Sequence, residues 1–297
     1  MNKKISQHPL LNNIYWKPLV AVVVWGFSFI ATKYALNEVK PVSIVFLRQL
    51  FGMSFLVAIA YKQKMSFAVK GREFSWVLLL GALTTLHLWI QVTGLQWTSA
   101  SNTGWIIGIT PVLMAILGFI FFKEKILGQQ IAGILISFFG LLLLVGKGDL
   151  GNIDLIQNKG DLLIVASSFT WAVYSIVSKR ATINCSPLIT TFYLLLIMAV
   201  VTAPFTLNTE DINKIINLSF NGWLAIIFLG IFCSGVGYYL WARALSEMSA
   251  SRAGAFLYLE PFVTFFFATI MLNENVTLIT FLSGLIIIAG VILVNRK

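Results

Sequence analysis

One stretch of this chain occurs twice, first as residues 99–144 and again as residues 249–294. Matching residues lie 150 positions apart, and each copy has a small-residue start, an apolar run with a proline, a charged turn with one glutamate, and a second apolar run that contains glycine. The aligned residues are Ser99-Ala100-Ser101 with Ser249-Ala250-Ser251, Gly104 with Gly254, Pro111 with Pro261, Glu124 with Glu274, and Gly140 with Gly290. Each copy predicts a helical hairpin, and the duplication constrains the whole architecture.

The duplication also includes the residues before each hairpin. With matching residues 146 positions apart, Trp25 aligns with Trp171, Lys33 with Lys179 and Pro41 with Pro187. The repeating unit is therefore about half of the chain. We divide the sequence into an N-terminal tail, a first repeat, a linker, a second repeat and a C-terminal end, at 1–15, 16–146, 147–159, 160–294 and 295–297.

Composition indicates that both repeats lie in a membrane. The chain is 58% hydrophobic and 11% charged, with a mean hydropathy of +0.88, whereas an ordinary soluble domain is about 25% charged. Apolar runs long enough to cross a hydrocarbon core of about 30 Å as a helix recur ten times, at 16–36, 43–61, 74–95, 100–122, 128–146, 161–180, 187–207, 221–243, 250–272 and 277–294. These runs predict an all-α polytopic membrane protein without a soluble domain.

The net charge of +10 is explained by orientation in the membrane, so nucleic acid is not an expected partner. If the N-terminus is cytoplasmic, 15 of the 21 Lys and Arg residues lie on the cytoplasmic side, five lie on the other side, and Arg48 lies within the second span. This bias follows the positive-inside rule. The tail has no small-residue cleavage site, so we expect no removable signal peptide. We predict a multi-pass protein of the cytoplasmic (inner) membrane with both termini in the cytoplasm.

Each repeat contains five predicted helices, and five is an odd number. The second repeat must therefore enter the membrane in the opposite direction to the first. Many secondary transporters consist of such inverted repeats, with a site near the midplane that is exposed alternately to the two sides. The predicted fold is ten transmembrane helices, arranged as two inverted five-helix repeats around a central cavity.

Polar and aromatic side chains are concentrated on the first, third, fourth, sixth, eighth and ninth spans. In the third span, Thr84, His87 and Gln91 share one helical face. Polar faces turn away from lipid toward the bundle interior or a wet cavity, although a single hydroxyl can simply bond to a neighbouring helix. The candidate substrate-binding residues are Trp25, Phe29, His87, Gln91, Asn102, Trp105, Trp171, Tyr174, Tyr238, Trp241 and Tyr258.

Few charged residues lie near the middle of the predicted spans. Glu260 directly precedes Pro261, and an ionised carboxylate at this depth needs a partner, water or a proton. Two roles for Glu260 remain open: reversible protonation that couples transport to a proton gradient, and permanent acceptance of hydrogen bonds beside the proline. Arg48 lies about one turn inside the second span, so we expect it to snorkel outward in a structural role.

Prolines and turn glutamates receive structural interpretations. Pro111 and Pro261 each remove a backbone donor, so we expect both to kink their helices. Glu124 and Glu274 lie in tight turns and are expected to cap helices at the two membrane surfaces.

A cavity lined by the candidate substrate-binding residues is mostly neutral and aromatic. Such a wall suits an amphipathic small molecule, for example an apolar amino acid or a cationic aromatic compound.

Taken together, these features resemble the drug/metabolite transporter superfamily, in particular its bacterial ten-helix proteins with two EamA repeats. The resemblance is carried by Trp25-Gly26-x-x-Phe29, by Pro41 with Arg48, and by Ser-Ala-Ser followed by Pro, Glu and Gly in both hairpins. The resemblance covers the chain after residue 15. The second repeat departs from the family pattern at Ala172 and Leu194, which align with Gly26 and Arg48. The resemblance implies a transporter, commonly an exporter of amino acids and related metabolites, without fixing the substrate or the coupling.

The leading functional hypothesis is a secondary transporter that exports small metabolites and acts as a monomer or homodimer, with the proton as a candidate coupling ion. The alternatives are a facilitative channel-like uniporter or an uptake carrier, and more remotely an intramembrane enzyme. No Walker-type loop is present, so ATP is not the expected direct energy source. We expect no cofactor and no metal, because the two histidines, His8 and His87, form no His-Glu-x-x-His motif and Cys185 and Cys233 occupy unrelated repeat positions.

Cysteine labelling tests the inverted arrangement. In a background without Cys185 and Cys233, single substitutions Gln129→Cys and Asn275→Cys place one thiol in each of the two repeat-mate turns. We expect an impermeant maleimide applied to intact cells to label position 275 only, because that turn is predicted outside and the other inside. Labelling at both positions, or at neither, would contradict the prediction.

Overall fold

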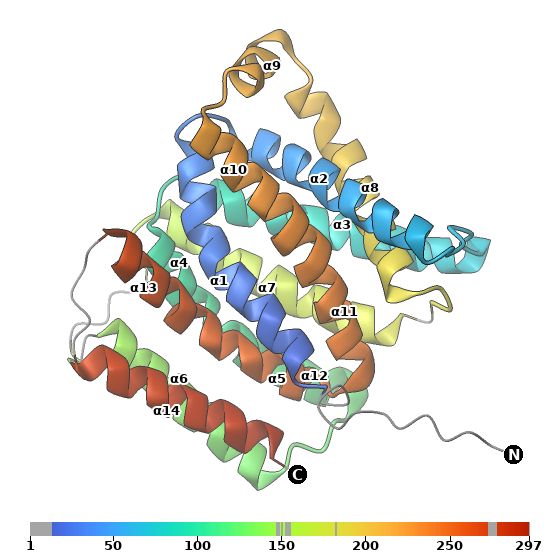
Figure 1. Ribbon diagram of the computed structural model, residues 1–297. Coiled ribbons are helices and arrows are strands. Elements are labelled where there is room, and N and C mark those ends of the chain that lie inside the picture. The colour runs from blue at the N-terminus through green and yellow to red at the C-terminus, as the bar shows by residue number, and fades with distance from the viewer. Residues whose placement is uncertain are drawn as a thin grey trace, which may run out of the picture.

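The computed structural model describes residues 14–146, 149, 151, 156–181, 183–272 and 278–296, and these residues form helices and loops without strands (Figure 1). The helices of the first repeat are α1 (Trp16–Leu36), α2 (Pro41–Lys62), α3 (Gly71–Gly94), α4 (Ala100–Ile107), α5 (Thr110–Phe122) and α6 (Gly128–Val145). Those of the second are α7 (Lys159–Arg180), α8 (Pro187–Thr206), α9 (Thr209–Ile216), α10 (Phe220–Phe228), η1 (Leu229–Gly237), α11 (Tyr238–Glu247), α12 (Ala250–Ala255), η2 (Phe256–Tyr258), α13 (Leu259–Leu272) and α14 (Leu278–Asn295).

Eight helical segments of the described residues are long and apolar enough to cross a membrane. They are Trp16–Leu36, Pro41–Lys62, Glu73–Gly94, Ala100–Phe122, Gly128–Val145, Lys159–Arg180, Pro187–Thr206 and Phe220–Glu247. Phe281–Asn295 is a shorter apolar helix, and the ninth predicted run is divided among α12, η2 and α13. The predicted turn at Glu274, the labelling position Asn275 and most of the N-terminal tail, including His8, lie outside the described residues.

One helix, α9, has no counterpart among the predicted apolar runs. Its first turn is capped by Asn208, whose side-chain oxygen accepts from the Asp211 N–H at 3.0 Å, and it carries two acidic residues, as the positive end of a helix dipole favours. Asp211 pairs with Lys40 at the start of α2 at 2.8 Å, and the Lys40 ammonium lowers the pKa of the Asp211 carboxyl. A search for long apolar runs misses this short, amphipathic helix.

The duplicated Ser-Ala-Ser motif begins α4 in the first repeat and α12 in the second. Ser99 accepts from the Asn102 N–H at 2.9 Å, and its repeat mate Ser249 accepts from the Arg252 N–H at 3.3 Å. A serine at the N-cap satisfies one of the N–H groups that a helix leaves unpaired at its start. The motif therefore has the same structural role in both repeats.

Both mid-helix prolines interrupt their helices, as predicted. Ahead of Pro111, α4 ends at Ile107 and α5 begins at Thr110. Ahead of Pro261, the chain passes through the 3₁₀ turn η2 before α13 begins at Leu259. A proline cannot donate to the carbonyl four residues earlier and its ring crowds that group. The breaks fall at equivalent places in the two repeats.

Contacts at the helix ends show that matching helices run in opposite directions. Lys17, at the start of α1, pairs with Glu247 at the end of α11, and Lys179, at the end of α7, donates to the Met248 carbonyl at 2.6 Å. The start of α1 and the end of its repeat mate α7 therefore lie at the same face of the molecule. Tyr15 donates to the Asn295 carbonyl at 3.0 Å, so both described chain ends lie there too. We call this the proximal face and the opposite one, at Lys33 and Thr98, the distal face.

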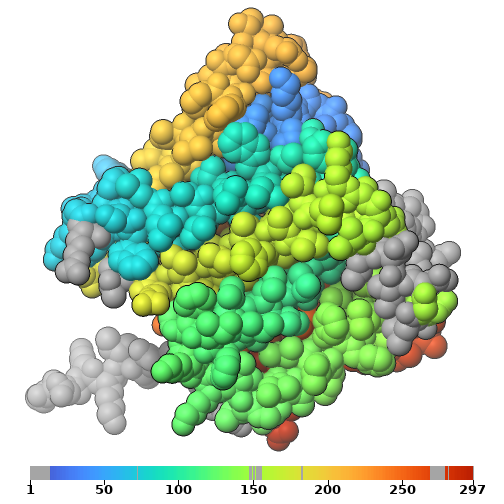
Figure 2. Space-filling view, turned by 180° about the vertical axis from the view of Figure 1, so that it is seen from behind, coloured from blue at the N-terminus to red at the C-terminus, as the bar shows by residue number. Residues whose placement is uncertain are grey.

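The main helix contacts follow the same pattern when each helix is replaced by its repeat mate. The pairs α2·α8 and α6·α14 each join repeat mates, and the contact of α3 with α7 is matched by that of α1 with η1 and α11. Figure 1 shows α6 and α14 side by side at one edge, and Figure 2 shows α3 and α7 as adjacent bands on the rear face. The two halves are thus related by an approximate two-fold axis.

Small residues allow α6 and α14 to pack closely. A Cβ atom on Gly290 would lie 2.6 Å from the Gly133 carbonyl oxygen and would overlap Ser137. Because lipid tails are as apolar as leucine, helices in a membrane associate through such close backbone contact rather than through the hydrophobic effect.

The matched substitutions Gly290→Val and Ala289→Val test this contact. Gly290 is buried against α6, whereas its neighbour Ala289 is exposed on the outer side of α14. Overpacking of a tight contact costs about 1–3 kcal/mol, so we expect Gly290→Val to lower the midpoint of thermal unfolding in detergent and Ala289→Val to leave it nearly unchanged. Equal midpoints for the two variants would contradict the assigned packing.

Candidate functional site

A small cavity lies between the two repeats, and both repeats contribute to its wall. The space open to the centres of water molecules is about 40 Å³, enough for a few waters, since one needs about 10–15 Å³. The wall consists of Trp25, Ser28, Phe29, Arg48, His87, Leu88, Gln91, Ile107, Thr110, Ser168, Trp171, Tyr238 and Glu260. Polar groups thus converge on a water-sized space inside a bundle of apolar helices.

Trp25 and Trp171, the repeat mates from α1 and α7, meet each other at this cavity. Their ring centroids are 5.1 Å apart and the rings are nearly perpendicular, at 88°, which is a favourable edge-to-face geometry. Tyr174, Tyr238 and Trp241 pack against Trp171 at centroid distances of 4.9, 5.4 and 5.9 Å. We call these five residues the aromatic cluster.

The aromatic cluster extends from the cavity toward the proximal face. Tyr174 and Trp241 belong to the proximal parts of α7 and α11, and both are almost fully buried behind the cavity wall. Trp241 donates from Nε1 to the Ser175 hydroxyl at 3.2 Å, which fixes its ring. The cluster therefore lies on the proximal side of the cavity.

The π-helix η1 contributes polar groups to the centre. Trp25 donates from Nε1 to the Cys233 carbonyl at 3.1 Å, and Gly237 allows the Trp25 ring to approach the backbone of η1. Ser234, in the same segment, accepts from Arg48 Nε at 2.9 Å. π-Helical turns are rare and are frequently found at functional sites.

Arg48 is buried at the cavity, so the prediction that it snorkels to the surface is wrong. The side chain is 3% exposed, and its one hydrogen bond within the described residues is the Nε contact to Ser234. The inward direction follows from the packing of α2 between α8 and η1. A single arginine in an otherwise apolar span was the available signal for a cavity residue.

Glu260 lies in the cavity wall and is 4% exposed. Within the described residues, its carboxylate accepts no hydrogen bond and forms no ion pair, while its backbone carbonyl accepts from Thr264 Oγ1 at 2.9 Å. Gly26 lets α1 approach this part of α13, because a Cβ there would lie 3.0 Å from the Glu260 carbonyl oxygen. The backbone at Glu260 is thus held firmly while its carboxylate has no protein partner in the described chain.

His87, Gln91 and Phe29 also line the cavity, as expected from the sequence. His87 Nδ1 lies 2.9 Å from the Ser167 carbonyl oxygen, which requires a proton on Nδ1; in the neutral imidazole Nε2 is then an acceptor. The His87 ring packs on Trp171 at 4.8 Å. The hydroxyl of Thr110, the repeat mate of Glu260, is buried and has no hydrogen-bond partner among the described residues.

Five candidate residues do not line the cavity. Tyr174 and Trp241 lie behind its wall, as described above, and the other three lie elsewhere. Asn102 and Trp105 line a separate vestibule of about 630 Å³ at the distal face, together with Lys33, Gln96, Trp97, Thr98, Ser99, Ser101, Val145, Gln157 and Asn158. Asn102 donates to Asp161 at 2.6 Å, so its amide helps to join α4 to the start of α7. Tyr258 is fully buried in the 3₁₀ turn η2 and does not reach the cavity.

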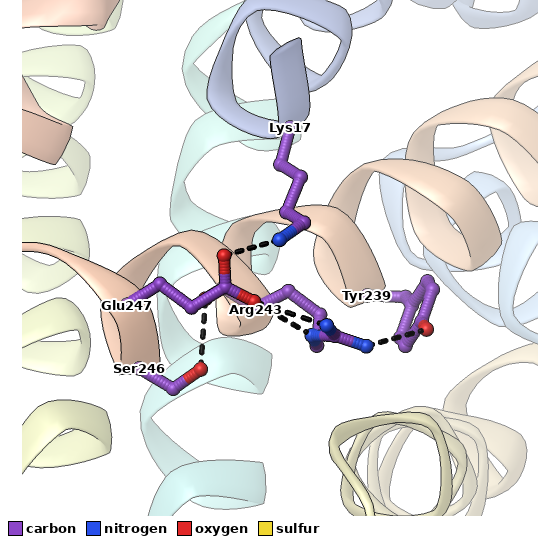
Figure 3. Close-up of polar contacts among 5 residues, drawn as sticks. All are labelled: Lys17, Tyr239, Arg243, Ser246 and Glu247. Carbon is purple, nitrogen blue, oxygen red and sulfur yellow. Dashed lines mark hydrogen bonds and ion pairs between the residues drawn. The ribbon is translucent and has the colours of Figure 1, made fainter. Parts of the chain in front are cut away.

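Ion pairs hold the proximal face together. The Lys17 ammonium and the Arg243 guanidinium converge on the Glu247 carboxylate, and Arg243 also donates to the Tyr239 hydroxyl at 3.4 Å (Figure 3). Glu124 accepts from the Ala250 N–H at 3.0 Å at the start of α12. The predicted capping role of Glu124 is therefore confirmed, although the capped helix belongs to the other repeat.

In the described part of the chain, no three His, Cys, Asp or Glu side chains come together in a way that could hold a metal ion. Cys185 and Cys233 are both free thiols.

A helical membrane protein made of two repeats, with a polar cavity between them, is the class that this fold and site define. The sequence pattern described as the EamA-like transporter family matches twice, at residues 14–146 and 158–296, and the chain belongs to that family. It is 29% identical over 282 residues to an uncharacterized transporter of Archaeoglobus fulgidus, covering 94% of this chain and 96% of the relative.

Other relatives extend the comparison. The chain is 29% identical to the uncharacterized transporter YyaM of Bacillus subtilis, over 85% of this chain and 84% of that protein. It is 27% identical to a probable amino-acid metabolite efflux pump of Escherichia coli, over 92% of this chain and 91% of the pump. A crystal structure of a protein that is 18% identical superposes with a TM-score of 0.75 over 94% of this chain and 95% of the other, which supports the fold.

Proposed function

We propose that this protein is a secondary transporter that exports small amphipathic metabolites, amino acids and related compounds among them, across the cytoplasmic membrane. The observation that carries the proposal is the cavity between the repeats, where polar side chains from both halves face a space inside an apolar bundle. Polar groups at this depth are costly and are typical of substrate and ion pathways. The named efflux relative from Escherichia coli adds support for the direction and substrate class.

Alternating access is the proposed mechanism. Ten membrane crossings in two inverted repeats, with both termini cytoplasmic, would make the proximal face the cytoplasmic one. The opposite directions of α1 and α7 and the symmetric packing of the repeats support this arrangement. Rocking of one half against the other around a central site exposes that site to each side in turn.

Growth inhibition tests the substrate class and direction. Cells that express the chain are challenged with toxic concentrations of amino acids, their analogues and cationic aromatic drugs. We expect expression to raise tolerance to at least one amphipathic compound, because export lowers its internal concentration. Increased sensitivity would indicate uptake, and equal tolerance to every compound would count against export.

The cavity residues are proposed to contact substrate, and the aromatic cluster to close its path on the proximal side. Truncations Trp25→Ala and Trp171→Ala should lower the transport rate by about tenfold or more at equal protein level. Removing a large buried aromatic ring costs about 3–5 kcal/mol of stability. Here we expect much of that cost to fall on the conformation in which the aromatic cluster is packed closed. Trp241→Ala should have the same direction of effect. Transport is measured as counterflow of labelled substrate in proteoliposomes.

Phe281→Ala is the matched control, since this aromatic side chain on α14 is 53% exposed toward the lipid side of the bundle. We expect its rate and expression to equal those of the wild type. Normal rates in all three Trp variants would mean that the aromatic cluster serves helix packing alone.

Coupling to protons is proposed to involve Glu260, whose buried carboxylate has no protein partner in the described chain. A carboxylate that binds a proton in one orientation and releases it in the other links substrate movement to the gradient. Glu260→Gln keeps the shape of the side chain and cannot ionise. We expect this variant still to exchange substrate across liposomes when the substrate is supplied in excess, but to lose accumulation driven by an imposed pH gradient. Accumulation at the wild-type level would rule out the coupling role.

A further inference from the structure

The cavity contains one buried cation and one buried carboxylate, and this pair points to a more specific substrate class. Arg48 is 3% and Glu260 is 4% exposed, and both line the same space. Among the described residues, no ion pair joins Arg48 to Glu260; the ion pairs found there all involve other residues. A guanidinium group and a carboxyl group therefore face one cavity without a direct ion pair between them.

Each of these charged groups has unused hydrogen-bonding capacity. Arg48 uses only Nε, for its bond to Ser234, so within the described residues its two terminal amino groups have no protein partner. The Glu260 carboxylate likewise accepts nothing from the described protein. A guanidinium presents its terminal N–H groups in a fork that matches a carboxylate, and a carboxylate is the natural partner of an ammonium group.

The two charges are departures from the internal symmetry of the chain. Arg48 comes from the first repeat and aligns with Leu194, and Glu260 comes from the second and aligns with Thr110. Neither repeat mate is charged. Packing of the repeats does not require either charge, since Leu194 and Thr110 fill the equivalent positions as buried residues.

We infer that the cavity binds zwitterions, with the substrate carboxylate at Arg48 and its ammonium group at Glu260. This inference rests on the proposed transport function and narrows its substrate class to α-amino acids and other molecules that carry one charge of each sign. A zwitterion supplies the missing partner to both buried groups at once. A cation leaves Arg48 unpaired, an anion leaves Glu260 unpaired, and a neutral molecule leaves both, which is costly in the membrane interior.

The rest of the wall fits an apolar or aromatic side chain. Trp25, Phe29 and Trp171 line the same space, and a tryptophan face also attracts an ammonium group. The space of about 40 Å³ has room for a few waters, so an amino acid that binds there displaces such waters and moves cavity side chains apart. The carboxylate and ammonium replace the hydrogen bonds of the displaced waters.

A ligand panel on the purified full-length chain tests the charge rule. Each common amino acid is titrated beside its α-amide, which lacks the negative charge, and its N-acetyl derivative, which lacks the positive charge. Affinity is read from the concentration dependence of the thermal unfolding midpoint. We expect at least one amino acid to bind, and both of its derivatives to bind about tenfold more weakly or worse, because each leaves one buried charge without a partner.

Two conservative variants assign the charges. Arg48→Gln should weaken binding of the amino acid about tenfold or more while leaving the α-amide unaffected. Glu260→Gln should weaken the amino acid similarly while leaving the N-acetyl derivative unaffected. A purely structural role for either residue would lower the affinity of all three ligand forms together. Glu210→Gln and Lys214→Gln, on the exposed helix α9, remove one charge each outside the cavity and should change no affinity.

Each outcome decides the inference. It is overturned if no amino acid binds, if an α-amide or N-acetyl derivative matches its parent, or if the variants weaken all three ligand forms equally. Counterflow in proteoliposomes separates this failure from failure of the transport function. Exchange of a singly charged or neutral compound would retain the transporter and remove the zwitterion rule, whereas selective binding without any exchange would retain the rule and remove transport.

Discussion

The cost of a polar group in hydrocarbon determines this structure more than any attraction does. Apolar side chains gain little by leaving lipid for a protein interior, so the helices associate through close backbone contacts and buried polar groups. Gly290 against Gly133 is the first kind of contact, and Arg48 with Ser234 is the second. Because both kinds depend on particular residues at particular positions, a few small and polar side chains define the packing of a chain that is otherwise Leu, Ile, Val and Phe.

Eight membrane-length helices in the described part of the chain, and the duplication of the chain, were predicted from the sequence, because both depend on local patterns. Apolar runs predicted the helical segments, and Pro111 and Pro261 predicted the breaks. The packing of α2 with α8 and of α6 with α14 was not predicted, because the repeat tells which helices correspond but not which helices touch. Short α9 was missed, since it depends on a cap and an amphipathic pattern over only two turns.

The candidate site was predicted only in part, because helical spacing tells which residues share a face but not which faces meet. Trp25, His87 and Glu260 line the cavity, whereas Asn102 and Trp105 line the distal vestibule. Arg48 was assigned to the surface by its closeness to a helix end. Its true direction depends on the contacts of α2 with α8 and η1, which are remote in sequence.

The repeats are symmetric in backbone but unequal in the side chains that close the cavity. Tyr174 and Trp241 form the proximal part of the aromatic cluster, and their repeat mates are Ser28 and Gln91. In an alternating-access carrier, the opposite conformation would close the cavity on the distal side, and Ser28 and Gln91 would occupy the positions that form that closure. Aromatic rings bury far more apolar surface than a serine or glutamine does, so the two closures differ in free energy. On the proposed mechanism, a carrier with such a difference would rest mainly with its proximal side shut, and substrate binding would supply the energy to open it.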